Sequence, residues 1–78
     1  MYKTTVFFES VAQAKQFVNI CNELDYRIEL VADPYVIDAK SIMGIFSLDF
    51  SKPISLRAFC PDAEEFKNKI GQFLVENQ

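Results

Sequence analysis

The side chains that could carry out nucleophilic or acid–base chemistry are mainly serines, lysines and carboxylates, because the 78 residues include no histidine. Ser10 would need a neighbouring base to act as a nucleophile. The nearest lysine in sequence, Lys15, misses the i+3 and i+4 positions that meet on a helix. The acidic group Asp62, Glu64 and Glu65 is typical of a helix start, where carboxylates complement the helix dipole. We therefore expect no enzymatic activity.

Cysteine and glycine usage indicates that the chain binds no metal and no cofactor. The spacing of the two cysteines, Cys21 and Cys60, matches no metal-binding motif, and no histidine is present to complete a zinc site. The two glycines, Gly44 and Gly71, are too few to form a phosphate-binding loop. We expect two reduced, buried thiols in a cytosolic protein.

Composition and charge predict a single small domain spanning residues 1–78. The net charge of −3 and the absence of a basic stripe exclude the usual nucleic-acid binders. No apolar stretch reaches the roughly 18 residues of a membrane span. The first residues have a strand pattern and do not resemble a signal peptide. We therefore expect a cytoplasmic protein without nucleic-acid or membrane partners.

The N-terminal part of the chain predicts a strand followed by a helix. Residues 2–8 are rich in Thr, Val and Phe, which favour a strand. Phe7 falls on the polar face of that strand, so it lies either at a covered edge or on a partner surface. Ser10 and Gln13 form a capping-box pattern, and apolar residues then recur at helical spacing to about Glu23.

The middle of the chain predicts a hairpin and a short helix. Residues 26–30 alternate like a half-buried strand, and a tight turn around Pro34 leads into a second strand over 35–39. Residues 41–48 are apolar on several sides, which favours a short helix with Ser41 as its N-cap. Gly44 lowers the intrinsic helicity by roughly 1 kcal/mol relative to alanine, so packing must hold this helix.

The C-terminal part predicts a fourth strand over 54–58 and a closing helix. Asp62 and Glu65 form a variant of the capping box, and the apolar stripe of the helix runs to Leu74. Gly71 within it indicates either close packing against the sheet or local fraying. The element order βαββαβα predicts an α+β domain whose helices cover one face of an antiparallel sheet. The pattern does not fix the strand order.

The run over residues 40–48, which begins Lys40-Ser41-Ile42-Met43-Gly44, resembles the regulatory-serine segment of the HPr family, the phosphocarriers of the bacterial sugar phosphotransferase system. The element order and length agree with this resemblance, which implies an open-faced sandwich of four antiparallel strands covered on one face by three helices. By the same resemblance, Ser41 is the phosphorylation site of HPr kinase.

The resemblance also places Ser10 where the family has its phosphorylated histidine, Ala12 where it has an arginine, and Gln13 where it usually has proline. The loop before Ser10 is also shorter. A serine phosphate ester is far less reactive than a phosphohistidine, and Ala12 cannot hold phosphoryl charge. We therefore expect no catalytic residue and no phosphohistidine transfer, as in Crh, the HPr-like protein that lacks the histidine and keeps the serine.

The apolar side chains after Ser41 complete the expected site. By resemblance, Ile42, Met43 and Phe46 form a patch that docks a protein partner, either HPr kinase or a carbon-catabolite regulator. The alternatives are that Ser41 only caps its helix and that the three apolar residues pack into the core. Two further readings are a phosphocarrier component by family membership, and a structural domain without phosphorylation that self-associates through Phe7 and Phe46. We expect a monomer or a weak homodimer.

Overall fold

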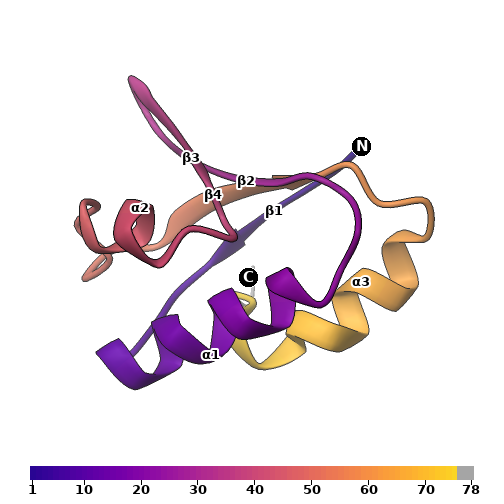
Figure 1. Ribbon diagram of the computed structural model, residues 1–78, viewed down its shortest axis with the longest axis horizontal. Coiled ribbons are helices and arrows are strands. Elements are labelled where there is room, and N and C mark those ends of the chain that lie inside the picture. The colour runs from indigo at the N-terminus through magenta and orange to yellow at the C-terminus, as the bar shows by residue number, and fades with distance from the viewer. Residues whose placement is uncertain (76–78) are drawn as a thin grey trace.

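A four-stranded antiparallel sheet forms one layer of the computed structural model, which describes residues 1–75 (Figure 1). The predicted α+β class and the order βαββαβα are confirmed. In chain order the elements are β1 (Tyr2–Val6), α1 (Val11–Asn22), β2 (Ile28–Ala32), β3 (Tyr35–Asp38), α2 (Ile42–Phe46), β4 (Ile54–Ala58), α3 (Ala63–Ile70) and a 3₁₀ turn (Gly71–Phe73). The strands lie in the order β1-β4-β2-β3, which the sequence did not predict.

The helices lie on one side of the sheet, and the other side is uncovered. Helices α1 and α3 run side by side beneath the strands in Figure 1, and α2 packs against both α1 and β3. The central strand β4 shows how the two faces differ. Leu56 lies opposite Leu30 and is buried under the helices, whereas Arg57 lies opposite Glu29 on the uncovered face.

The core is centred on three phenylalanines that come from distant parts of the chain. The ring centroids of Phe8 and Phe17 are 5.0 Å apart, those of Phe8 and Phe73 are 5.7 Å apart, and those of Phe17 and Phe73 are 5.4 Å apart. All three side chains are almost fully buried. Tilted and edge-to-face pairs at this separation add stability beyond the area they bury. The cluster fixes α1 and the C-terminal segment against the end of β1.

The C-terminal segment differs from the predicted helix through Leu74. Helix α3 ends at Ile70, and after the 3₁₀ turn the chain runs beside the free edge of β1. The Phe7 N–H donates to the Phe73 carbonyl at 2.9 Å, and Leu74 bridges to Val6. Strand-like pairing satisfies backbone groups of the edge strand, which a continued helix would have left open. Phe7 therefore lies at a covered edge.

Gly71 is not required by close packing, since a Cβ atom placed on it would meet no atom of residues 1–75 within 4 Å. The other observed bounds differ from the predicted ones by about two residues at most. The strand predicted over 26–30 is shifted to Ile28–Ala32, because only Asp33 and Pro34 separate the paired residues Ala32 and Tyr35. None of the helices in the described part of the chain is long and apolar enough to span a membrane.

Candidate functional site

Ser41 begins α2 and caps it, as its sequence pattern predicts. Its backbone is extended (φ −104°, ψ 111°), and its Oγ accepts a hydrogen bond from the Gly44 N–H at 3.0 Å. The Ser41 carbonyl accepts from the Ile45 N–H at 3.1 Å, and the Ser41 N–H donates to the Asp38 carbonyl at 3.0 Å. The side chain is only half-buried. The Ser41 hydroxyl therefore caps the helix and is still accessible to solvent.

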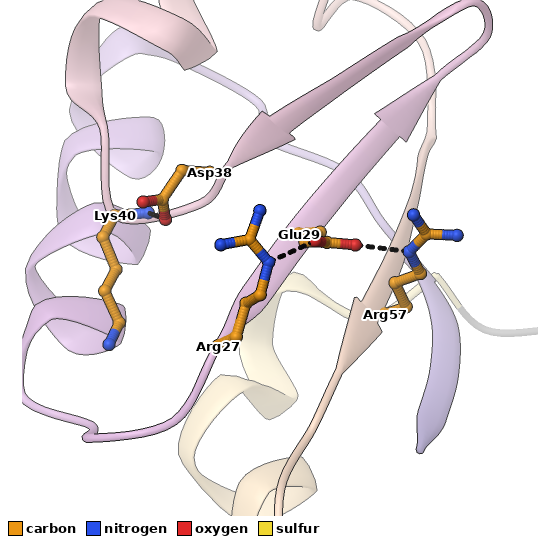
Figure 2. A network of polar contacts seen from close by, with 5 residues as sticks. All are labelled: Arg27, Glu29, Asp38, Lys40 and Arg57. Atoms are coloured by element: carbon orange, nitrogen blue, oxygen red, sulfur yellow. Dashed lines mark hydrogen bonds and ion pairs between the residues drawn. The ribbon is translucent and has the colours of Figure 1, made fainter.

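Lys40, which precedes Ser41, ties the start of α2 to the end of α1. Its Nζ donates to the Leu24 carbonyl at 2.7 Å, and its carbonyl accepts from the Asn22 side-chain amide at 3.1 Å. Its N–H donates to Oδ1 of Asp38 at 2.9 Å. Figure 2 shows the Lys40 ammonium on the side away from the Asp38 carboxylate. The segment before Ser41 is thus fixed from several directions.

A hollow of about 330 Å³ lies between α1 and α2. Both chain neighbours of Ser41 contribute to it. Its lining combines ammonium, amide and apolar groups and consists of Lys15, Val18, Asn19, Asn22, Lys40 and Ile42. Lys15 and Lys40 are the charged residues of this lining, and the ammonium of Lys40 is bound to the Leu24 carbonyl.

The exposure expected for the apolar side chains of α2 is confirmed. Met43 is 77% exposed and Phe46 is 41% exposed, whereas Ile42 is half-buried against the core and Ile45 is fully buried. Within this short helix, Met43 and Phe46 are therefore the exposed apolar side chains. We name Ile42, Met43 and Phe46 the α2 patch.

Phe50, which no sequence pattern singles out, extends the α2 patch towards the core. The ring centroids of Phe46 and Phe50 are 6.2 Å apart, and those of Phe50 and Phe8 are 6.3 Å apart. Phe50 is half-buried and lies beyond the end of α2. Only its apolar character pointed to it, since it follows the helix without a periodic pattern.

Ser10 caps α1 and has no catalytic setting. Its Oγ accepts from the Gln13 N–H at 3.2 Å, as the capping-box pattern predicts. The return bond differs from that pattern, because Oε1 of Gln13 accepts from the N–H of Glu9, at 2.9 Å, and not from that of Ser10. Ala12 is exposed in the first turn. Two hollows of about 430 and 470 Å³ adjoin this end of α1, and both are lined by Phe7 and Glu9. The titratable group nearest to Ser10 in sequence is the carboxylate of Glu9.

The two cysteines differ in burial, and the buried one is unreactive. Cys21 is fully buried, and this burial raises the pKa of its thiol to about 12. A thiol with such a pKa is almost entirely protonated at neutral pH and is a poor nucleophile. Cys60 is partly buried and free. Within residues 1–75, no three side chains of His, Cys, Asp or Glu gather as a metal site would require.

A buried carboxylate lies on the uncovered face of the sheet, which the sequence did not reveal. Glu29 is only 6% exposed, and its two carboxylate oxygens accept hydrogen bonds from Nε of Arg27 and Nε of Arg57 (Figure 2). These hydrogen bonds, that of Arg27 first, lower the pKa of Glu29 below its ordinary value of 4.5. Arg57 comes from β4, so the cluster depends on the strand order.

Comparison with protein-family models matches residues 11–76 to the PTS-HPr family, described as "PTS HPr component phosphorylation site". The match begins one residue after Ser10. No curated protein gives a significant match to the sequence.

Solved HPr structures resemble the fold over most of its length. HPr-C-His from Thermoanaerobacter tengcongensis has 28% sequence identity and a TM-score of 0.75, with 92% of this chain and 89% of that chain covered. HPr from Bacillus anthracis has 26% identity and a TM-score of 0.68, with 95% and 94% covered. Crh from Bacillus subtilis, described as a swapped-domain dimer, has 23% identity and a TM-score of 0.63, with 91% and 88% covered.

Proposed function

Because the chain belongs to the HPr family of the phosphotransferase system, we propose that it is a non-enzymatic, cytoplasmic regulatory module that docks proteins and does not carry phosphohistidine. The single observation that carries this proposal is the exposed α2 patch beside the capping hydroxyl of Ser41. Met43 presents 77% of its surface to solvent one turn or less from Ser41.

The absence of a phosphohistidine site is supported by three features of the start of α1. Histidine does not occur in the sequence, and Ser10 uses its oxygen to cap the helix. Ala12 brings no positive charge, whereas Glu9 brings a negative one that would repel a phosphoryl group. A serine ester would also retain its phosphate, since it lacks the reactivity of a phosphoramidate. This end of α1 is therefore suited to helix capping and not to phosphoryl transfer.

Ser41 is the residue we propose for phosphorylation, by the HPr kinase that the family resemblance implies. Its half-buried hydroxyl lies at the first turn of α2, and a phosphate there would add roughly 1.5 to 2 negative charges. Lys15 and Lys40 line the adjacent hollow and would offset part of that charge. The exposed carboxylate of Asp38 would oppose it, so the modification would change the local field around α2.

The α2 patch is the surface we propose for the protein partner, which by resemblance is a carbon-catabolite regulator. Flexible methionine and aromatic side chains are adaptable, apolar contact groups that are common at binding surfaces. The ring of Phe46 lies beside that of Phe50, which packs against the core and so supports the α2 patch. A phosphate on Ser41 would then place a charged group at the border of an apolar contact area.

The phosphorylation half of the proposal is tested by incubating the protein with a Bacillus HPr kinase and ATP and analysing it by mass spectrometry. We expect one added phosphate, located on Ser41, and none on the variant S41A. S10A serves as a control, because it removes the other capping serine and should leave the modification unchanged. An unmodified wild-type protein would contradict this half.

The docking half is tested by measuring binding of the phosphorylated protein to a purified carbon-catabolite regulator from a Bacillus species. We expect M43A and F46A to weaken binding, each by about tenfold or more, as for central apolar contacts. Y35A is the matched control, since Tyr35 is also an exposed apolar residue (64%) but lies on β3. Equal binding by all variants would contradict the α2 patch as the docking surface.

A further inference from the structure

A row of four charged residues crosses the uncovered face of the sheet. Lys3 lies opposite Arg57, Arg57 lies opposite Glu29, and Glu29 lies opposite Asp38. Residues directly opposite on neighbouring strands share one face. Read across the strand order β1-β4-β2-β3, the row carries two positive charges followed by two negative ones.

Each end of the row is available to a partner. Lys3 and Asp38 are exposed, and neither forms an ion pair within residues 1–75. Figure 2 shows that Arg57 uses its Nε to hold Glu29 while its terminal nitrogens point away from that carboxylate. Arg57 is 37% exposed, so these terminal donors can reach a second acceptor.

Apolar groups accompany the row on the same face. Val36, opposite Val31, is 48% exposed. Phe59 follows β4, is 47% exposed, and its N–H donates to the Arg27 carbonyl at 2.9 Å. No helix covers this face in Figure 1. A charged centre with exposed apolar neighbours is a surface that can support a protein contact.

We propose that this face binds a second copy of the same chain, sheet against sheet, about a two-fold axis parallel to the strands. Such an axis reverses the order of the strands, so β1 faces β3 of the second copy and β4 faces β2 of the second copy. Lys3 then faces Asp38 twice in each dimer, and the Arg57–Glu29 pairs, already formed within each copy, lie at its centre. A two-fold axis across the strands would instead set Lys3 against Lys3. The charge order therefore selects the first arrangement.

The same axis sets Arg27 of one copy against Phe59 of the other, because these two residues are paired on β2 and the continuation of β4. A guanidinium over an aromatic ring is a favourable contact. The dimer leaves the α2 patch free on the opposite side, so it would present two docking surfaces. This inference rests on the sheet alone and not on the proposed function.

The test is a charge swap measured by analytical ultracentrifugation. We expect the wild-type protein to show a concentration-dependent dimer that dissociates at high salt. K3E alone and D38K alone each place like charges together twice per dimer, so we expect dissociation constants raised by about tenfold or more. A mixture of K3E and D38K should form a heterodimer, and the double variant K3E/D38K should recover the homodimer.

Controls separate this contact from other modes of association. K69E makes the same charge change on an exposed residue of α3, outside the row, and should leave the dimer intact. Circular dichroism melts confirm that every variant is folded. The proposal is wrong if the wild-type protein is monomeric at all concentrations. It is equally wrong if the dimer survives K3E and high salt, as an exchange of strands would, or if M43A abolishes it instead.

Discussion

Gly44 is the position where the packing of α2 can be tested most sharply, by the substitution G44A. In an open helix this change would stabilise by roughly 1 kcal/mol. In this fold an added Cβ would lie 2.4 Å from Cγ2 of Ile37 and 3.3 Å from Oγ of Ser41. Ile37 is β-branched and lies on β3, so Cγ2 can yield only by a change of χ1 or by movement of α2 away from the sheet.

The overpacking at Gly44 should outweigh the gain in helix propensity. Forcing a methyl group into a packed site costs about 1–3 kcal/mol. Subtraction of the propensity gain leaves a net loss of about 0–2 kcal/mol. Because the contact is far inside van der Waals distance, we expect the upper half of that range, about 1–2 kcal/mol. For a domain of this size that corresponds to a decrease in Tm of roughly 4–16 °C.

The matched variant is G71A, and the assay is thermal and urea unfolding followed by circular dichroism. Gly71 has helical dihedral angles (φ −54°, ψ −37°) and open space at its Cβ position, so G71A should stabilise by about 0.4–1 kcal/mol. Opposite signs for the two variants are the expected result. If G44A stabilises as G71A does, the close approach of α2 to β3 is wrong, and the outward placement of Met43 is unsupported.

Three further predictions concern single side chains. S41A should lower the free energy of unfolding by about 1 kcal/mol and speed amide exchange at Gly44, because the cap is lost; unchanged exchange would contradict the capping hydrogen bond. Cys60 should react with a thiol reagent in the native protein at mildly alkaline pH. Cys21, whose pKa is raised to about 12, should react only when the protein unfolds. Equal reaction rates of the two thiols in the native protein would contradict the burial of Cys21. The pKa of Glu29 is lower in the folded than in the unfolded chain, so ionised Glu29 stabilises the fold above about pH 4.5, and this stabilisation is lost as the pH falls below that value. The urea midpoints of the wild type and E29Q should therefore converge on acidification. If the difference between the two midpoints does not change with pH, the two arginine contacts are contradicted.

The local features of the site could be predicted from the sequence because they depend on residues close together in the chain. Ser41 caps α2 through a contact three residues away, and the capping box of Ser10 and Gln13 spans the same distance. The exposure of Met43 and Phe46 followed from the family resemblance, since periodicity alone did not decide which apolar residues of a short helix face the core.

The features that could not be predicted depend on which segments lie side by side. Glu29 alternates outward along its strand, but its burial requires Arg57 from β4, 28 residues away. Leu74 continues the apolar stripe of α3, and only the open edge of β1 explains why it leaves the helix. Both cases need the strand order, which local patterns do not contain.

The most direct test of the central claim is incubation of the purified protein with enzyme I and labelled phosphoenolpyruvate, with HPr from a Bacillus species as the positive control. The family fold combined with Ser10 and Ala12 at the start of α1 predicts that the control becomes labelled and that this protein does not. Transfer of label to this chain at a rate comparable with that of the control would contradict the claim that it docks proteins without acting as a phosphohistidine carrier.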